Sequence, residues 1–556
     1  MAYNTVAQLI TQALQELSLT SEVTLEHPAD LTHGDFSCNV AMVLAKDAGK
    51  NPRELAEEIV GALSGHEDVA KVEVAGPGFI NFHLSENYFT RATEEILANK
   101  EAWGRSTMHE GKHFLIEHSS PNLFKPFHIG HLVNNTLGES LVRLVRCAGA
   151  KVTALSWPSD VSPGIAKAVW GVIDKGWQDD LTIERIGEAY VHGVAHYDES
   201  DAVKKEVDAL NVTLYNKDTS APEWAVYEKG RKLSLMYFEG ITQRLGSQFD
   251  GYIFESESEE AGKKIIKEHT PGVFEESDGA VIFRGSEYGS YDSVFINSAG
   301  FGTYLAKDIG LLGQKFSTYT FDQSVTLTDI EQKHHFELVR AAASQIDSQW
   351  SEKSNYLQHG RLRLTSGKIS SRTGNVPLAE DILDTVEERA RERMKENNRD
   401  ADDATAEHIA TAAVKYSIAR VGMGKNITFD LEESLSFEGN SGPYLQYTHA
   451  RARSILNKAE DTPLNAATRV GLAITDMERL LYRFPKTIER AAKEYEPHYV
   501  ANYLIELASA FNSWYAHEQV LDGGEAQSYK LALTEAVATT IHNGLFVLGI
   551  KAPEKM

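Results

Sequence analysis

The chain opens with an amphipathic pattern between Met1 and Leu17. Apolar side chains recur there every three or four positions, at Val6, Leu9, Ile10, Ala13, Leu14 and Leu17. That spacing predicts a helix with one buried face. The segment lacks the basic start and the following apolar block of a signal peptide, so we interpret it as an amphipathic helix. Short helical and strand-like runs then alternate to about residue 105, which predicts a small α/β domain over residues 1–105.

Between residues 113 and 156 the pattern becomes that of a strand, a helix and a second strand. His113 to His118 is a short apolar run, and Lys151 to Ser156 is another. The helix between them ends at Gly149 and has one apolar face, which carries Val133, Leu137, Leu141, Leu144 and Ala148. This is a βαβ unit, the building block of a parallel, nucleotide-binding sheet of the Rossmann type.

The rest of the chain is predicted to be mostly helical. Residues 170–290 show helical patterns, such as Glu184 to His196, and we interpret them as insertions in a catalytic domain over residues 106–395. Helical patterns continue from about residue 402, which predicts an all-α domain over residues 396–556. Its expected helices are Ile409 to Val421, Tyr444 to Leu456, Leu472 to Phe484, Tyr499 to Trp514 and Leu531 to Leu548.

Composition narrows the class of protein. A chain of 556 residues with 42% hydrophobic and 24% charged residues forms a multidomain globular protein, and no apolar run is long enough for a membrane span. The two cysteines, Cys38 and Cys147, form neither a paired framework nor a zinc pattern, which favours the cytoplasm. The formal charge of −25 argues against a nucleic-acid surface, so any RNA contact must come from local basic and aromatic patches.

The loop after the first strand of the βαβ unit carries the main candidate chemistry. It reads Ser119-Ser-Pro-Asn-Leu-Phe-Lys-Pro-Phe-His-Ile-Gly-His131, so His128, Gly130 and His131 fall at the start of the helix. A helix start offers free backbone N–H groups and a positive dipole end, and two imidazoles there can donate hydrogen bonds to phosphate. Gly130 lets a nucleobase approach the backbone. The histidines could merely cap the helix, but their place in a βαβ unit favours a triphosphate site.

A second loop, far downstream, reads Thr365-Ser-Gly-Lys-Ile-Ser-Ser-Arg-Thr-Gly-Asn375. Such a glycine-flanked loop, with Lys368 and Arg372, can close over phosphates and stabilise charge at the α-phosphorus. Alone, it would more often be a solvated surface turn. Together with the histidine loop, it favours a role in phosphate chemistry.

His128-Ile-Gly-His131 and Lys368-Ile-Ser-Ser-Arg372 resemble the HIGH and KMSKS signatures of class I aminoacyl-tRNA synthetases. The chain specifically resembles arginyl-tRNA synthetases over nearly its whole length: Gly76-Pro-Gly-Phe-Ile-Asn-Phe82 is similar to their N-terminal additional domain, and Ser441-Gly-Pro-Tyr-Leu-Gln-Tyr-Thr-His-Ala-Arg451 to the opening of their anticodon-binding domain. The resemblance implies that L-arginine is activated with ATP and Mg²⁺ to arginyl-adenylate, in the presence of tRNA. The arginyl group is then expected to pass to the 2′-hydroxyl of the terminal adenosine of tRNA(Arg).

The resemblance also implies which residues bind each small substrate. ATP contacts fall on the two histidines of the loop and on Ser119, Asn122, Gly130, Ile369 and Ser370, and arginine contacts fall on Glu117, Asn122, Tyr304, Asp308 and Gln332. Carboxylates suit a cationic substrate, because a guanidinium presents five donors in a planar fork. Asp308 could instead be an exposed helical carboxylate paired with Lys307 or its neighbours.

Two departures from the family pattern alter the expected catalytic set. Ser371 stands where the second lysine of KMSKS is expected, and Lys125 matches the lysine by which some arginyl enzymes compensate. We therefore predict a catalytic set of His128, His131, Lys125 and Lys368. Pro158-Ser-Asp-Val-Ser162 stands where many relatives have a Gly-Asp-x-Gly loop, which leaves a role for Asp160 open.

Contacts with tRNA are implied in two places. Tyr444, Tyr447 and Arg451 match anticodon-reading positions about one helical turn apart, with plain helix packing of the tyrosines as the alternative. Asn81 and Phe82 match positions that touch the tRNA D-loop.

Neither a protein-bound metal nor a stable oligomer is expected. His192 and His196 lie four residues apart but lack a third ligand, so a solvated helix face is the better interpretation, as it is for His334 and His335. The alternatives to an arginine enzyme are a class I synthetase for another amino acid, an HxGH nucleotidyltransferase and a non-catalytic tRNA-binding paralogue. A cysteine synthetase would need zinc ligands that two cysteines do not supply, and nucleotidyltransferases need no long helical domain. Family likeness favours a monomer.

Overall fold

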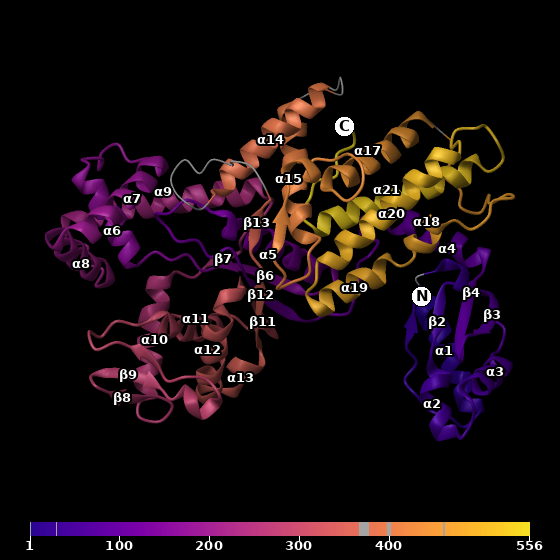
Figure 1. Cartoon of the computed structure of the whole chain (residues 1–556), viewed down its shortest axis with the longest axis horizontal. Helices are drawn as coiled ribbons and strands as arrows, with labels where there is room; N and C mark the ends of the chain where they lie inside the picture. Colours follow the sequence, from indigo (N-terminus) through magenta and orange to yellow (C-terminus); the bar gives the residue numbers. More distant parts are fainter. Residues whose placement is uncertain (1, 29, 366–376, 397–401, 460–461) are drawn as a thin grey trace.

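The computed structural model describes residues 2–28, 30–365, 377–396, 402–459 and 462–556. Figure 1 shows an N-terminal domain in indigo, a central part built around a sheet, and a bundle of helices in yellow at the C-terminal end. Within the described ranges, no helix is both long and apolar enough to cross a membrane.

The N-terminal domain packs helices around a four-stranded antiparallel sheet of order β1-β2-β4-β3. Val6, Ile10, Ala13 and Leu14 are buried in its core, which confirms the amphipathic pattern of the first helix. The elements are α1 (Ala2–Glu16), β1 (Leu25–Glu26), β2 (Phe36–Cys38), α2 (Val40–Ala48), α3 (Pro52–Ala62), β3 (Val69–Ala75), β4 (Phe79–Leu84) and α4 (Glu86–Asn99).

The central sheet has five parallel strands in the order β12-β11-β5-β6-β7. Its strands are β5 (His113–Glu117), β6 (Lys151–Ser156), β7 (Gly251–Tyr252), β11 (Gln323–Asp329) and β12 (Ser354–His359), and α5 (Ile129–Cys147) joins β5 to β6. The predicted βαβ unit is therefore confirmed. From β5 the chain runs to β6 on one side, and it later returns to β11 on the other. A crevice for ligands forms at such a reversal, at the carboxyl ends of the strands.

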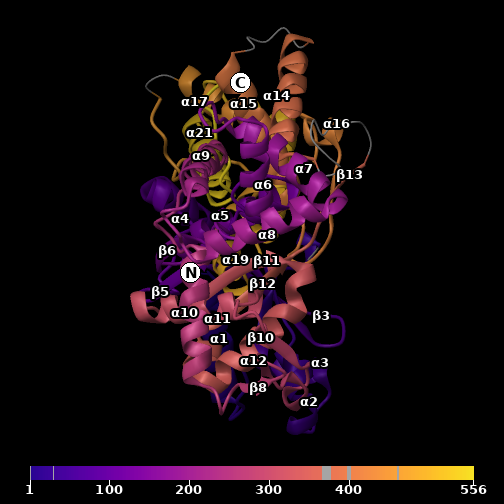
Figure 2. The ribbon, with the colours of Figure 1, turned by 90° about the vertical axis from the view of Figure 1, so that its left-hand side faces the viewer.

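Two groups of elements are inserted into this sheet, one above the other in Figure 2. The first is helical: α6 (Pro163–Asp174), α7 (Ile183–Glu199), α8 (Asp201–Tyr215) and α9 (Pro222–Arg244). The second contains α10 (Glu255–Glu268), β8 (Glu275–Ser277), β9 (Ala280–Phe283), β10 (Ser293–Ile296), α11 (Tyr304–Thr318), α12 (Lys333–Ile346) and α13 (Ser348–Glu352). The helical prediction for residues 170–290 missed the antiparallel sheet β10-β9-β8. Its strands are three or four residues long, too short to show a period.

The C-terminal part is helical, with two corrections. It contains α14 (Ala379–Glu396), α15 (Asp403–Ala419), α16 (Leu431–Ser434), α17 (Gly442–Lys458), α18 (Asp476–Leu481), α19 (Phe484–Glu494), α20 (His498–His517) and α21 (Gln527–Val547). A strand, β14 (Ile427–Phe429), pairs with β13 (Leu362–Leu364), so the predicted boundary at 395 divides a sheet that the structure holds together. The helix predicted from Leu472 to Phe484 is broken after α18, because Pro485 in the first turn of α19 lacks an N–H group for the preceding turn.

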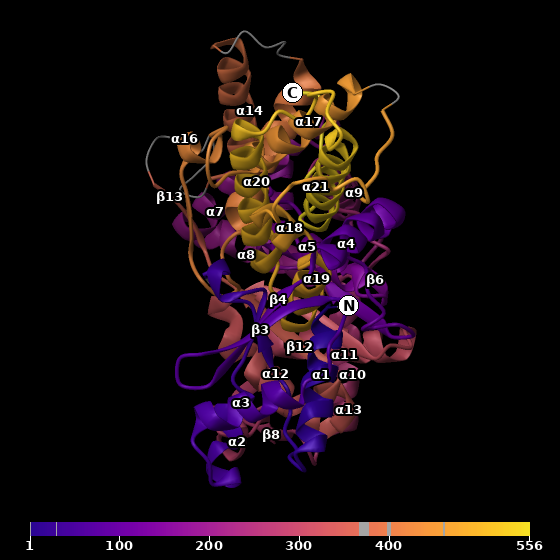
Figure 3. The same cartoon turned by 90° about the vertical axis from the view of Figure 1, so that its right-hand side faces the viewer.

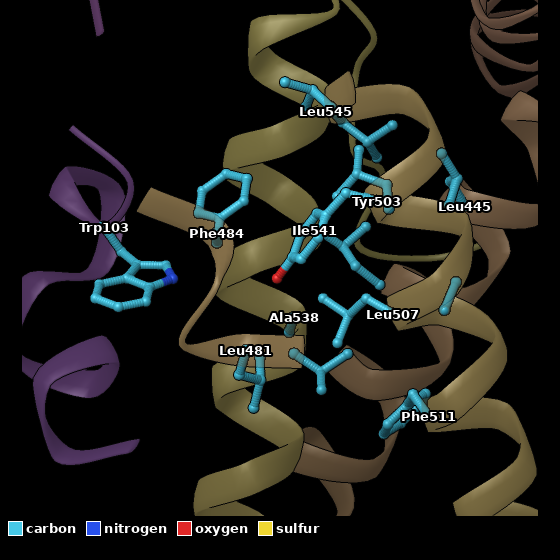
Figure 4. Close-up of a cluster of buried hydrophobic side chains, with 14 of the residues drawn as sticks. Trp103, Leu445, Leu481, Phe484, Tyr503, Leu507, Phe511, Ala538, Ile541 and Leu545 are labelled. Carbon is cyan, nitrogen blue, oxygen red and sulfur yellow. The ribbon is translucent and has the colours of Figure 1, made fainter. Parts of the chain in front are cut away.

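The helical bundle and the N-terminal domain are packed together. Figure 4 shows the bundle core, with Trp103 from the linker close to Phe484; it also includes Leu445, Leu481, Tyr503, Leu507, Phe511, Ala538, Ile541 and Leu545. Figure 3 shows the N-terminal domain below this bundle. Tyr482 is buried among aromatic rings of the N-terminal domain, and Arg479 of α18 forms an ion pair with the buried Asp35.

Candidate active site

A pocket of about 440 Å³ opens at the carboxyl ends of the central strands. Its walls include Glu117 at the end of β5, Asp329 at the end of β11 and His359 at the end of β12. The start of α5 supplies His128, Gly130 and His131 to the same wall. The two groups that the sequence singled out, the histidine loop and a carboxylate at a strand end, therefore share one pocket.

The histidine loop is locked by its own hydrogen bonds at the start of α5. The Nδ1 atom of His128 accepts from the backbone N–H of Gly130 at 3.1 Å, and Nδ1 of His131 accepts from the backbone N–H of His128 at 3.3 Å. The two rings stack with their centroids 3.8 Å apart. Burial lowers the pKa of both histidines, and the charge of Lys125 lowers it further. A neutral imidazole that accepts at Nδ1 carries its proton on Nε2, so each ring keeps one N–H donor.

Lys125 lies beside this histidine pair. Its ammonium sits 4.7 Å from the centre of the Tyr190 ring of α7. It precedes His128 by three residues on the same loop, and its positive charge contributes to the lowered pKa of both imidazoles. The predicted cation is therefore close to the histidine loop.

The segment between β5 and the histidines separates into a buried and an open half. Ser119 has a left-handed backbone with φ of 55°, and its side chain is buried against His118 and Asn135. Ser120 lines the pocket in its place, and Asn122 is exposed on the pocket wall. A side-chain contact of Ser119 with ATP is thus not available in this arrangement. Its backbone N–H is also taken, because it donates to Asn134 Oδ1 at 2.6 Å.

Glu117 is almost fully covered and carries a cationic partner. The ammonium of Lys315, on α11, lies 2.5 Å from Glu117 Oε2. Lys315 also donates to the hydroxyl oxygens of Thr326 at 3.1 Å and Ser324 at 3.4 Å. The carboxylate therefore sits in the seam between β5 and β11, where Glu117 and Thr326 are register partners.

Asp308 lies behind the pocket wall rather than on it. It is 4% exposed and accepts a hydrogen bond from His335 Nε2 at 2.6 Å. Burial raises the pKa of Tyr356 on β12, and the charges of Asp308 and Glu117 raise it further. The alternative of an exposed Asp308 paired with Lys307 is wrong, because Lys307 is buried and forms an ion pair with Glu255 at 2.5 Å. Tyr304 and Gln332 do line the pocket.

The second phosphate loop, with Lys368, Ile369, Ser370, Ser371 and Arg372, lies outside the described residues. The chain on its far side returns to the histidine loop. The backbone N–H of Ile129 donates to Pro377 O at 3.1 Å, and that of Ala379 donates to Phe127 O at 2.8 Å.

Comparison with known proteins decides the family. The catalytic domain of class I (R) tRNA synthetases matches residues 92–430, the DALR anticodon binding domain residues 445–556, and the arginyl tRNA synthetase N-terminal domain residues 4–84. The chain is 31% identical to an arginine-tRNA ligase of Ligilactobacillus salivarius and 30% identical to one of Halothermothrix orenii, over 99% of each chain. The chain belongs to the class I arginyl-tRNA synthetases.

Solved structures agree with this assignment. The arginyl-tRNA synthetase of Thermus thermophilus superposes with a TM-score of 0.82 and 26% identity over the full length of both chains. That of Plasmodium falciparum shares the fold, with a TM-score of 0.81 and 18% identity over 100% of this chain and 99% of its own. The expected fold class and the expected enzyme class, a ligase of arginine and tRNA, are confirmed. A synthetase for another amino acid and a non-catalytic paralogue gain no support.

The predicted anticodon residues of the synthetase are all partly buried but differ in their surroundings. Tyr447 and Arg451 line an open pocket of about 630 Å³ with Tyr515 of α20, and the Arg451 guanidinium lies 4.6 Å from the Tyr447 ring centre and 5.5 Å from that of Tyr515. Tyr444 instead packs against the bundle core, and its hydroxyl accepts from Asn512 Nδ2 at 3.0 Å. Tyr444 is therefore a packing residue of the helices, which was the alternative interpretation, whereas Tyr447 and Arg451 face the open pocket.

The predicted D-loop residues are not exposed. Phe82 is fully buried in the core of the N-terminal domain, and Asn81 is 3% exposed and accepts from the Ser37 hydroxyl at 2.7 Å. Both lie on β4, which is an inner strand of its sheet. Side-chain contacts of these two residues with tRNA are therefore a wrong expectation, and their packing explains their residue types.

Asp160 and the histidine pairs have structural partners. Asp160 is buried and accepts from Arg231 Nε at 3.1 Å and from the backbone and hydroxyl of Ser256 at 2.9 Å, so it joins the two insertions. His192 is not simply solvated, because its Nε2 lies 2.7 Å from Asp174 Oδ2 and its ring stacks on Trp170. His335 is likewise held by Asp308, whereas His334 is exposed. In the described ranges, no group of three metal-binding side chains gathers.

Sequence reasoning missed four side chains around the pocket: Lys315, His335, Glu255 and Lys307. The signal for Lys315 was its place on the same helix face as Asp308, seven residues or two turns later. Glu255 at the start of α10 lines the pocket and is paired with Lys307. Nothing in the local pattern points to Glu255, because its partner lies in another helix.

Proposed function

We propose that this pocket holds ATP and arginine side by side, with the phosphates against the start of α5 and the cationic groups of arginine toward Glu117 and Asp308. The single observation that supports this most strongly is that the capped histidine pair and the buried Glu117 line one pocket. The enzyme then attaches L-arginine to tRNA(Arg). Mg²⁺ enters with ATP as part of the substrate.

On the ATP side, the start of α5 offers donors rather than charges. The Nε2–H groups of His128 and His131 and the positive end of the helix dipole can each stabilise phosphate oxygens. Gly130 also suits the packing: a Cβ atom there would lie 3.0 Å from the His128 ring, so a side chain would shift this ring by a few tenths of an ångström. Ser120 and Asn122 on the pocket wall complete the polar contacts that we propose for ATP.

On the amino-acid side, the carboxylates select a cation. Glu117 would bind one cationic group of arginine, with Asn122, Tyr304 and Gln332 on the same wall. Asp308 lies behind the pocket wall, where it accepts from His335, and we propose that it meets the guanidinium from that side. Lysine would leave acceptors of this site unpaired, which is the physical basis of discrimination.

The reaction follows from this placement. The arginine carboxylate attacks the α-phosphorus of ATP, the bond to pyrophosphate breaks, and arginyl-adenylate forms. The 2′-hydroxyl of the terminal adenosine of tRNA then attacks the arginyl carbonyl, and AMP leaves. Positioning and electrostatics supply the rate, with Lys125 and Lys368 stabilising the charge on the phosphates. We propose that tRNA must be bound for the first step.

The helical domain would bind the anticodon through its open pocket. Tyr447 and Tyr515 offer two ring faces and Arg451 a cation between them, a combination suited to unstacked bases. We further propose that the enzyme acts as a monomer in the cytoplasm.

Aminoacylation of total tRNA with each amino acid in turn tests this function. We expect charging with arginine alone, and about a 100-fold or larger loss of kcat/KM for arginine in Asp308→Ala, because a buried charged acceptor is removed. Val470→Ala, at an exposed position of the C-terminal part, is the matched control and should leave arginine charging unchanged. Charging with lysine or glutamine at the rate of arginine would contradict the proposed pocket.

A further inference from the structure

Lys315 is buried next to the pocket residues Glu117 and Thr326, and its ammonium contacts polar partners. It is 1% exposed, and its ammonium is within reach of Glu117, Thr326 and Ser324 at 2.5, 3.1 and 3.4 Å. The contact with Glu117 is an ion pair, and the ammonium donates hydrogen bonds to the Thr326 and Ser324 hydroxyls. Lys315 is buried and does not line the pocket, whereas Glu117 does, so the charge of Lys315 acts on the pocket through Glu117.

Lys315 holds one oxygen of Glu117. The ion pair involves Oε2, and a carboxylate has a second oxygen with its own lone pairs. Since Glu117 lines the pocket, the second oxygen can serve a substrate cation while the first is fixed from below. The side chain of Glu117 is 4% exposed, so Lys315 rather than water is the main partner of this oxygen.

We propose that Lys315 is a positioning residue for arginine: it orients the Glu117 carboxylate from the side opposite the pocket, so that the substrate cation meets a fixed negative charge. The proposal rests on the proposed function, in which Glu117 binds arginine. Without the ammonium, a carboxyl buried to this extent favours its neutral form, which attracts a cation weakly. Arginine binding would then have to release a proton.

Other titratable groups surround Glu117, but each has a partner or a different place. They are Asp308 with His335, Glu255 with Lys307, Arg361 with Asp329 and Glu331, Tyr356 and His359 on β12, and His128 and His131 at the start of α5. Lys315 is the cation that lies directly on the Glu117 carboxylate among the described ion pairs. A change in the pH dependence of arginine binding after its removal therefore reports on this pair.

The test is the KM for arginine in tRNA charging between pH 6.5 and 8.5. For Lys315→Met we expect a KM raised about 10-fold or more at pH 7.5 and falling as the pH rises, with kcat within about threefold of wild type. Lys315→Arg restores the charge and should keep KM within about threefold of wild type, with the wild-type pH profile. A wild-type KM and profile in Lys315→Met would overturn the proposal. So would a Lys315→Arg variant that behaves as Lys315→Met does.

Two further variants separate positioning from folding. Lys530→Met is a matched control, because Lys530 is also a buried, ion-paired lysine but lies in the helical domain. It should leave the KM for arginine and its pH profile as in wild type. If Lys315→Met does not fold, Lys315→Gln keeps a donor toward Thr326 without the charge and carries the same expectation; a wild-type profile there contradicts the proposal.

Glu117→Gln distinguishes failure of this proposal from failure of the proposed function. If Glu117→Gln leaves the KM for arginine unchanged, the arginine contact itself is wrong. If it raises KM while Lys315→Met does not, only the positioning role is wrong. If both raise KM, adding Lys315→Met to Glu117→Gln should change KM by less than about threefold, because the two residues act as one unit.

Discussion

Two lysines of this synthetase are buried to the same extent but are held in different ways. Lys315, below the pocket, lies against the carboxylate of Glu117. Lys415, on α15, is fully buried and donates to the backbone carbonyl oxygens of Leu245 at 2.6 Å and Gly549 at 2.7 Å. Burial and the positive charge of Arg143 lower the pKa of Lys415 to about 7, although Glu139 opposes this.

The difference teaches what each cation is suited to do. An opposite charge at contact distance stabilises a buried ammonium, and the pair can present a fixed carboxylate to a substrate. Carbonyl dipoles bind a lysine whether or not it is charged. Leu245 follows α9 of the first insertion and Gly549 follows α21 of the helical bundle, so Lys415 ties these two parts together. Lys315 holds a carboxylate of the pocket, and Lys415 connects two parts of the fold.

The largest expected effect is on stability, and it separates the two lysines. Lys315→Met leaves a buried carboxylate without its cation, which costs ~3–5 kcal/mol of unfolding free energy. Lys415→Met leaves two carbonyl groups without a donor, which costs ~1–3 kcal/mol. Urea unfolding of both variants measures this, and the KM of Lys415→Met for arginine, expected within about twofold of wild type, is the control. A greater loss of stability in Lys415→Met would break the comparison.

A smaller effect is expected in the pH dependence of stability. The pKa of Lys415 is lowered to about 7 in the folded enzyme, whereas an unfolded lysine keeps about 10.4. Between pH 7 and about 10 the unfolded chain therefore binds more protons, so this residue makes stability rise with pH, by at most ~1.4 kcal/mol per unit. Below pH 7 the lysine is charged in both states and this slope vanishes.

The difference in melting temperature between wild type and Lys415→Met measures this slope. As the pH rises from 7 to 9, the melting temperature of the wild type should increase relative to that of Lys415→Met. A difference that stays constant over this range would show that Lys415 does not lose its proton in the folded enzyme.

The sequence predicted the parts of the fold whose signal is local. The strands His113–Glu117 and Lys151–Ser156 and the helix between them follow from apolar periodicity, and the histidine loop follows from its place between them. Glu117, Asn122, Tyr304 and Gln332 line one pocket, as the resemblance to arginyl-tRNA synthetases implied. The periodicity of the sequence alone did not predict this grouping.

The remaining features depend on tertiary contacts. The pairing of Lys315 and of His335 could not be predicted from the sequence, because the carboxylates that they hold come from other elements; the helical spacing of Lys315 from Asp308 places it on a face but does not name its partner. Phe82 was expected to contact tRNA, but it is a core residue. The motif from Gly76 to Phe82, by which the N-terminal domain resembles its family, also supplies side chains to the core of that domain. The strand Ile427–Phe429 is only three residues long, and its partner lies more than sixty residues away.

The central claim is that one pocket holds the phosphates of ATP at the start of α5 and a cationic amino acid at Glu117. A crystal structure of the enzyme with arginine and a non-hydrolysable ATP analogue tests it most directly. We expect the phosphates within hydrogen-bond distance of His128 and His131, and a cationic group of arginine on the Glu117 carboxylate, with Lys315 still in place beneath it. Arginine bound elsewhere, or with both cationic groups turned away from Glu117, would contradict the account.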